Sequence, residues 1–124
     1  MIRNILAIDD SASMREILRA ALGQAGYEVT LATDGDEGLE HALAQHFDLV
    51  LSDLHMPRVS GLELVRKLRA NPSYFETPIL ILTTESDQTF KTALRDAGAT
   101  GWLEKPVDPD LLLDLASALC EAQA

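Results

Sequence analysis

The chain has 124 residues, 47% hydrophobic and 24% charged, and this length and balance fit one globular domain over residues 1–124. Ten basic and twenty acidic residues give a formal net charge of −10, which argues against non-specific binding to nucleic acid or anionic membranes. Cys120 is the only cysteine, so no disulfide forms within the chain, and no apolar run reaches the length of a bilayer span. We therefore expect a soluble, cytoplasmic monomer.

Short apolar runs alternate with helical patterns along the chain. The runs have strand length, and three are continuous apolar stretches typical of strands buried on both faces of a parallel sheet. They occupy residues 5–8, 28–32, 49–52, 79–83 and 100–103. Apolar residues at helical spacing follow each run, within residues 14–25, 39–43, 62–68, 90–97 and 111–119.

Helix start and stop signals agree with these boundaries. Ser60, Asp34 and Asp108 have the residue types and spacing of N-caps. Gly26 and Gly98 follow helical patterns, as C-terminal stops do. The alternation predicts an α/β fold: a single doubly wound (βα)5 domain whose five-stranded parallel sheet is covered by helices on both faces.

Residues that can carry chemistry lie where the predicted strands end. Asp9 and Asp10 follow the first strand, Asp53 the third, Thr83 ends the fourth and Lys105 follows the fifth. Each alone is explained by a turn, a helix cap or an exposed lysine. Because ligands bind at the carboxyl ends of strands in open α/β sheets, we expect these residues to share one pocket.

Three converging carboxylates repel one another, and such a cluster either raises a pKa or binds a cation. Hard oxygen ligands that leave room for water favour Mg²⁺. An aspartate placed there can attack phosphorus and form an acyl phosphate. Thr83 and Lys105 could then contact phosphoryl oxygens.

Four ordered motifs carry a resemblance to a known family. They are Ile8-Asp9-Asp10-Ser11, Ser52-Asp53-Leu54-His55-Met56-Pro57 with Gly61, Leu82-Thr83-Thr84, and Trp102-Leu103-Glu104-Lys105-Pro106. Together they resemble the receiver domain of two-component response regulators, from about residue 5 to 119, and most of all its stand-alone chemotaxis (CheY-like) type. The resemblance implies a flavodoxin-like sheet in the order 2-1-3-4-5.

The resemblance also implies roles for single residues. Asp53 would accept the phosphoryl group, with Thr83 and Lys105 completing the catalytic set. The Lys105–Pro106 bond would be cis. The implied ligands of the Mg²⁺ cofactor are Asp9, Asp10, Asp53 and the backbone carbonyl of His55, with Asp10 binding directly and Asp9 through water.

The implied partner is a sensor histidine kinase of the chemotaxis type, which would supply the phosphoryl group. Phosphorylation would switch the surface of the fourth helix, fifth strand and fifth helix, and so control a flagellar motor switch protein or a phosphatase. We class the chain as a phosphoacceptor switch with weak self-phosphorylation and hydrolysis, not as an enzyme. The expected switch and contact residues are Thr83, Trp102, Gln88, Lys91, Arg95 and Val107. Leu113 either joins them or is a lone exposed leucine.

Two positions depart from the commonest family pattern. Thr84 stands where alanine or glycine is frequent, and His55 occupies a variable position two residues after Asp53. We hypothesise that both residues tune the lifetime of the phosphoryl group. His41 and His46 have no histidine or cysteine at metal-binding spacing, and we expect them at the surface.

Other functions fit less well or remain open. A haloacid dehalogenase-type phosphatase needs a general acid two residues after its nucleophile, but Ser11 and Ala12 stand there. In a flavodoxin, the acidic pair Asp9-Asp10 would repel the flavin phosphate. A phosphorelay intermediate or phosphate sink remains open, as does a receiver cut from a longer regulator, although a start at Met1 and a short tail favour a complete chain.

Overall fold

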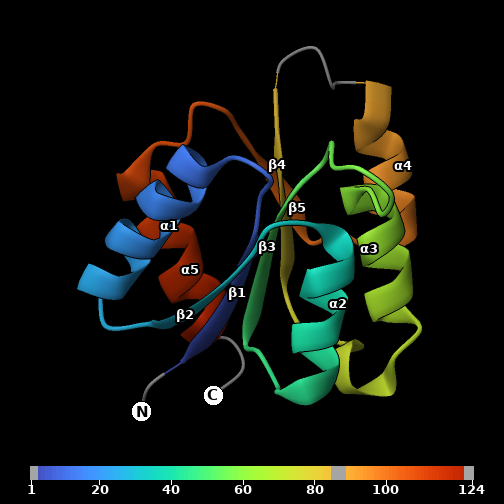
Figure 1. Ribbon diagram of the computed structural model, residues 1–124, viewed down its shortest axis with the longest axis horizontal. Helices are drawn as coiled ribbons and strands as arrows, with labels where there is room; N and C mark the ends of the chain where they lie inside the picture. The colour runs from blue at the N-terminus through green and yellow to red at the C-terminus, as the bar shows by residue number, and fades with distance from the viewer. Residues whose placement is uncertain (1–2, 85–88, 122–124) are drawn as a thin grey trace.

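The computed structural model describes residues 3–84 and 89–121, in which strands and helices alternate (Figure 1). The elements are β1 (Asn4–Ile8), α1 (Ala12–Gln24), β2 (Glu28–Ala32), α2 (Gly35–Ala44), β3 (Leu49–Asp53), α3 (Gly61–Arg69), the 3-10 helix η1 (Pro72–Tyr74), β4 (Ile79–Thr83), α4 (Lys91–Ala97), β5 (Gly101–Glu104) and α5 (Pro109–Glu121). None of the helices in the described ranges is long and apolar enough to cross a membrane.

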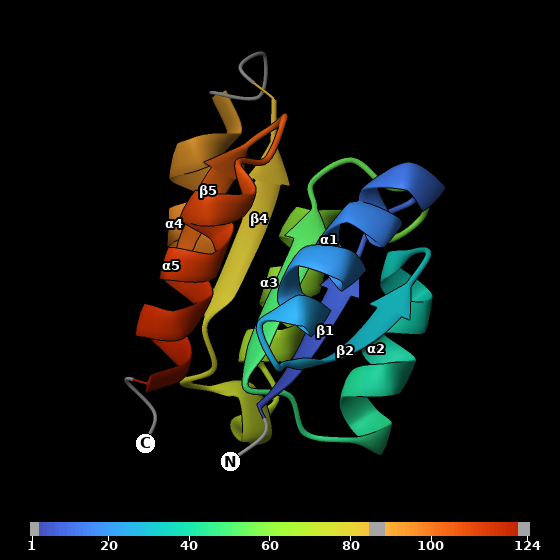
Figure 2. The same cartoon turned by 90° about the vertical axis from the view of Figure 1, so that its left-hand side faces the viewer.

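The five strands form one parallel sheet in the order β2-β1-β3-β4-β5, which Figure 2 shows from the side of α1 and α5. Helices α1 and α5 cover one face, and α2, α3 and α4 cover the other (Figure 1). The predicted doubly wound, flavodoxin-like fold and its strand order are therefore confirmed.

Alternation along the central strands divides the core into two clusters, one on each face of the sheet. Ile5 and Ala7 pack toward α1 and α5, whereas Leu6 and Ile8 pack toward the helices of the other face. Because both faces are covered, these side chains have no accessible surface, as the continuous apolar runs predicted.

Strand boundaries lie within one residue of the prediction, and the differences matter for the site. β3 extends to Asp53, and β5 begins and ends one residue later than expected. The register pairs Thr83 with Glu104, and the backbone N–H of Lys105 donates to the Thr83 carbonyl at 2.6 Å. This last bond places Lys105 beside the end of β4.

The predicted caps are present. Ser60 and Asp34 accept hydrogen bonds from the backbone N–H three residues later, and Asp108 accepts one from the N–H of Asp110. Gly26 and Gly98 have φ of +97° and +109°, the left-handed conformation that ends a helix.

Four large apolar residues that the helical patterns assigned to buried faces are exposed. Leu43 retains 76% of its accessible surface, Ile17 and Leu111 each retain 47%, and Phe90 retains 38%. The buried stripe of α1 is narrower than its apolar stripe and is centred on Leu18 and Leu22.

Arg69, the last residue of α3, joins three segments at the amino edge of the sheet. Its guanidinium donates to the carbonyls of Tyr74 and Thr77 at 2.6 and 2.7 Å, and to that of Gly98 at 2.9 Å. The segment after α3, α4 and α3 itself are thereby tied together.

Tyr74 is buried in the segment between α3 and β4. Its hydroxyl lies 2.8 Å from the carbonyl oxygens of Ala42 and of Gln45, and the ring of His46 stacks against it. The ring fills the core below α2 and α3, while its polar end satisfies the end of α2.

The described chain also begins and ends at the amino edge. Arg3 precedes β1, and Glu121 is the last residue of α5. Both line one hollow of about 230 Å³ together with Cys120.

Candidate functional site

The strands deliver the expected residues to one edge of the sheet. Asp9 follows β1, Asp53 ends β3, Thr83 ends β4 and Lys105 follows β5. Because β1, β3, β4 and β5 are neighbours and run parallel, their carboxyl ends meet at the same edge (Figure 2). Residues more than ninety positions apart in sequence are thus brought together.

Lys105 holds two of the acids. Its Nζ lies 3.1 Å from Asp9 Oδ2 and 3.1 Å from Asp53 Oδ1. Asp9 has no accessible surface and Asp53 retains 8%, so this ammonium offsets much of the cost of burying their charge.

The turn after β1 is built around Asp9. The backbone N–H of Ser11 donates to Asp9 Oδ1 at 2.9 Å, and Arg15 donates to the Asp9 carbonyl at 2.7 Å. Ser11 also caps α1 by accepting from the N–H of Met14. Both carboxylate oxygens of Asp9 therefore accept hydrogen bonds, whereas Asp10 is exposed.

The acids could hold a cation. Each of Asp9, Asp10 and Asp53 offers an oxygen within 4.8 Å of the others. Two oxygens on opposite sides of one Mg²⁺ lie about 4.2 Å apart, so small side-chain movements would bring this set into range. All three donors are hard oxygens, and the residues present fit that ion.

The buried charges shift the pKa values of the pair. Burial raises the pKa of Asp53, the hydrogen bond from Lys105 opposes this, and the negative charge of Asp9 adds to it. Burial disfavours the charge on Lys105, but the hydrogen bonds and charges of Asp53 and Asp9 outweigh it and raise the pKa of Lys105. Lys105 therefore stays charged, and the Asp53 carboxylate becomes more basic.

Thr83 contributes a buried hydroxyl at the end of β4. The residue is 1% exposed, and its Oγ1 has no hydrogen-bond partner in the part of the chain that the structure describes. An unpaired buried hydroxyl is costly and uncommon, and such groups gather at functional sites.

Gly61 sets the path of the segment between β3 and α3. A Cβ at this position would lie 2.5 Å from the carbonyl oxygen of Asp53 and 2.9 Å from Leu54 Cα. Only glycine allows this approach, which brings the start of α3 against the end of β3. The motif contained Gly61, but sequence reasoning did not find this role.

Arg58 anchors the same segment and was missed by sequence reasoning. It has φ of +66° and pairs with Asp34 and Asp36 at the start of α2, at 3.0 and 2.7 Å. No motif signals this contact, because it depends on the folded positions of two loops.

Most of the predicted switch residues lie on or next to α4 and β5. Trp102 is half-buried, and the Nζ of Lys91 lies 5.4 Å from its ring centroid and 3.4 Å from Glu104 Oε1. Arg95 is exposed and Val107 half-buried, whereas Gln88 lies outside the described residues. Leu113, on α5, is partly buried and packs against the core cluster on that face of the sheet.

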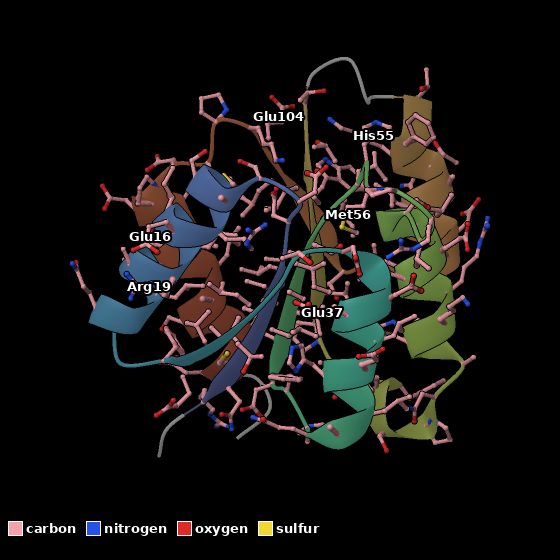
Figure 3. All side chains as sticks on the ribbon, viewed as in Figure 1. Glu16, Arg19, Glu37, His55, Met56 and Glu104 are labelled. Atoms are coloured by element: carbon pink, nitrogen blue, oxygen red, sulfur yellow. The ribbon has the colours of Figure 1, made fainter. Side chains whose placement is uncertain are left out.

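The two positions that depart from the family pattern both lie at the rim. His55 and Thr84 are exposed, and Figure 3 shows His55 and Glu104 at this end of the molecule, away from Glu16 and Arg19 on α1. The His55 ring meets Phe90 edge-on, with centroids 5.5 Å apart. The Lys105–Pro106 bond is cis, as expected.

Residues 5–117 match the family model described as the response regulator receiver domain. The chain belongs to this family. It is 60% identical to a response regulator from Burkholderia multivorans whose solution structure covers 96% of this chain and 95% of that one, with a TM-score of 0.81. Chemotaxis response regulator CheY4 of Vibrio cholerae is 42% identical, with a TM-score of 0.90 and coverage of 96% and 99%.

Curated relatives are longer than this receiver domain. The transcriptional regulatory protein DltR of Streptococcus agalactiae is 40% identical over 88% of this chain, and the match covers 48% of DltR. The chain therefore spans about half the length of such relatives.

Proposed function

We propose that Asp53 accepts a phosphoryl group from a phosphohistidine on a sensor kinase and thereby switches partner binding. The observation that carries this proposal is the double hydrogen bond from Lys105 to Asp9 and Asp53. It keeps a basic carboxylate next to a positive charge at a shared edge, where an incoming phosphoryl group would meet both.

The proposed transfer makes one bond and breaks one. Asp53 Oδ1 is held by Lys105, and Oδ2 attacks phosphorus. The P–N bond to the donor imidazole breaks, and its electron pair stays on that nitrogen, which is neutral once the ring carries a single proton. Lys105 can follow the transferred group, because its ammonium is a mobile point charge on a flexible stem.

Asp9, Asp10, Asp53 and the backbone carbonyl of His55 would hold Mg²⁺. The bound ion would supply positive charge to the phosphoryl oxygens. Asp10 is the exposed acid and suits direct ligation. Asp9 already accepts from Lys105 and Ser11, which suits contact through water.

Switching follows from the hydroxyl of Thr83. A phosphoryl group adds about two negative charges with three acceptor oxygens. Thr83 Oγ1 is buried without a partner among the described residues and would gain a charge-assisted hydrogen bond by donating to it. Its movement would open space for Trp102 and so alter the surface of α4, β5 and α5.

The product of these steps is a signalling state, so we propose a switch with weak self-phosphorylation and self-hydrolysis and not a turnover enzyme. A chemotaxis role, with a flagellar motor switch protein or phosphatase as partner, is supported by the likeness to CheY4 over 99% of that chain. The alternative of a receiver in a longer regulator is supported by the match to half of DltR.

Radiolabelled acetyl phosphate with Mg²⁺ tests the proposal. We expect one labelled aspartyl phosphate per chain, and complete loss of label in Asp53→Asn. Asp114→Asn, which removes an exposed carboxylate from α5, is the matched control and should label normally. A wild-type chain that takes up no label from acetyl phosphate or from a kinase would contradict the proposal.

The output is tested separately. With beryllofluoride and Mg²⁺ present, we expect the chain to bind a motor switch protein more tightly than without them. Transfer of label from Asp53 to a histidine phosphotransfer domain, without a gain in motor binding, would instead assign the chain to a relay or a phosphate sink.

A further inference from the structure

The first residue of α4 and the residue that caps it contact two different parts of the molecule. Phe90, at the N-cap position, meets the ring of His55 in the segment that follows Asp53. Lys91 contacts Trp102 and Glu104 on β5. This short stretch therefore lies between the phosphorylation site and the switch strand.

The geometry of β5 explains how one lysine reaches two residues. Trp102 and Glu104 are two positions apart on a strand, so their side chains leave the same face of the sheet. Trp102 packs against the core cluster beneath α2, α3 and α4, whereas Leu103 packs on the opposite face. Lys91 approaches from α4, the helix that covers this part of the sheet.

Lys91 is well placed to hold the tryptophan ring. Its side chain is 21% exposed, against 46% for Glu104, so the ammonium is partly withdrawn from water. A partly desolvated cation over an indole face is attracted more strongly than an exposed one. The same ammonium donates to Glu104 Oε1 at 3.4 Å, and this second contact restricts the lysine side chain.

We propose that Lys91 is a positioning residue that holds Trp102 in the arrangement in which Thr83 has not yet engaged a phosphoryl group. The proposal rests on the function proposed above. Thr83 Oγ1, which has no hydrogen-bond partner among residues 3–84 and 89–121, marks this arrangement, and Lys91, Trp102 and Glu104 stabilise it. Movement of Trp102 breaks the contact with Lys91, so this contact opposes switching.

The contact between Phe90 and His55 gives the same stretch a link to the site. A displacement of the segment after Asp53 moves the ring that meets Phe90, and Lys91 is the next residue along the chain. The contact between Lys91 and Trp102 therefore sets how much binding free energy a phosphoryl group at Asp53 must supply before Trp102 moves.

The test measures beryllofluoride affinity at saturating Mg²⁺ by calorimetry in wild type, Lys91→Gln and Lys91→Arg. Lys91→Gln should bind about two- to fivefold more tightly, the factor expected from losing one cation–π contact of moderate strength. Lys91→Arg keeps the cation and should match wild type.

A simple charge effect predicts weaker beryllofluoride binding by Lys91→Gln, because loss of a positive charge weakens anion binding. Lys67→Gln, on the exposed face of α3, removes the same charge away from Trp102 and is the matched control. Unchanged affinity in Lys91→Gln, or weakening equal to that of Lys67→Gln, would overturn the proposal.

A second readout needs neither metal nor beryllofluoride. Trp102 is the only tryptophan, so acrylamide quenching of its emission reports on this ring alone. We expect the quenching constant of Lys91→Gln to rise about twofold, as the ring is freed, with Lys67→Gln unchanged. Equal quenching in all variants would contradict the positioning role, even if wild type binds beryllofluoride. A wild type that binds none would instead refute the proposed function.

Discussion

At the amino edge of the sheet, the polar groups of Tyr74 and Arg69 each make several hydrogen bonds to backbone carbonyls. At the carboxyl edge, Asp53 and Asp9 share one ammonium, and the buried hydroxyl of Thr83 has no partner among the described residues. The same five strands thus end in a satisfied network on one side and in an incompletely satisfied one on the other. The difference separates the part that stabilises the fold from the part that can respond to a ligand.

The largest effect on folding is expected at the amino edge. Arg69→Met keeps most of the aliphatic stem but removes the donors to Tyr74, Thr77 and Gly98. We expect a loss of about 3 kcal/mol in the free energy of unfolding, because several carbonyls lose a charged donor. Urea denaturation measures it. A loss below that of an exposed control such as Arg66→Met would show that the network does not stabilise the fold.

Tyr74→Phe probes the same edge more gently. It leaves the ring in the core but removes the hydroxyl from the carbonyls of Ala42 and Gln45. We expect a loss of about 1.5 kcal/mol in the free energy of unfolding, since buried acceptors are left unpaired. Uptake of label from acetyl phosphate should be unchanged. Reduced labelling would show that the amino edge affects the site at the carboxyl edge, and would contradict the separation of the two.

Thr83→Val should act in the opposite direction. The substitution removes a buried hydroxyl that has no partner in the described part of the chain. We expect a gain of about 1 kcal/mol in the free energy of unfolding, together with loss of the Trp102 fluorescence response to beryllofluoride. If Thr83→Val destabilises the fold as Tyr74→Phe does, the hydroxyl is satisfied in solution and the contrast between the edges is wrong.

The raised pKa of Asp53 predicts a pH dependence. Burial makes its folded pKa higher than the ordinary value of 3.8, so the folded state binds the proton more tightly and wild type loses stability as pH rises through that range. Asp53→Asn has no ionisable group at this position and so lacks this loss of stability. In EDTA, we expect Asp53→Asn to be more stable than wild type at pH 7 and the difference to vanish below about pH 3.8. Denaturation at a series of pH values measures it, and a constant difference would contradict the shift.

The smallest effects are expected at the rim. His55→Ala and Thr84→Ala should change the rate of dephosphorylation several-fold without changing stability, because both residues are exposed beside the site. Release of phosphate from labelled protein measures the rate. Unchanged rates in both variants would remove the hypothesis that these residues tune the lifetime.

Sequence reasoning predicted the carboxyl edge better than the amino edge. Asp9, Asp53 and Lys105 each follow or end a strand, and parallel strands must bring such positions together, so local patterns were sufficient. Arg69 acts on carbonyl groups in distant segments, which carry no residue-specific signal. The exposure of Phe90 and Ile17 was also missed, since periodicity shows which side chains are apolar but not how wide a stripe the neighbouring elements cover.

The position of the described ends has a practical consequence. Arg3 and Glu121 line the same hollow, at the edge of the sheet opposite Asp9, Asp53 and Lys105. A sensor chip or fluorescent reporter attached at Arg3 or Glu121 would leave these acids facing solution. Because these two residues lie close together, a short linker could join the chain between them in a circular permutant, with new ends placed in an exposed loop of choice.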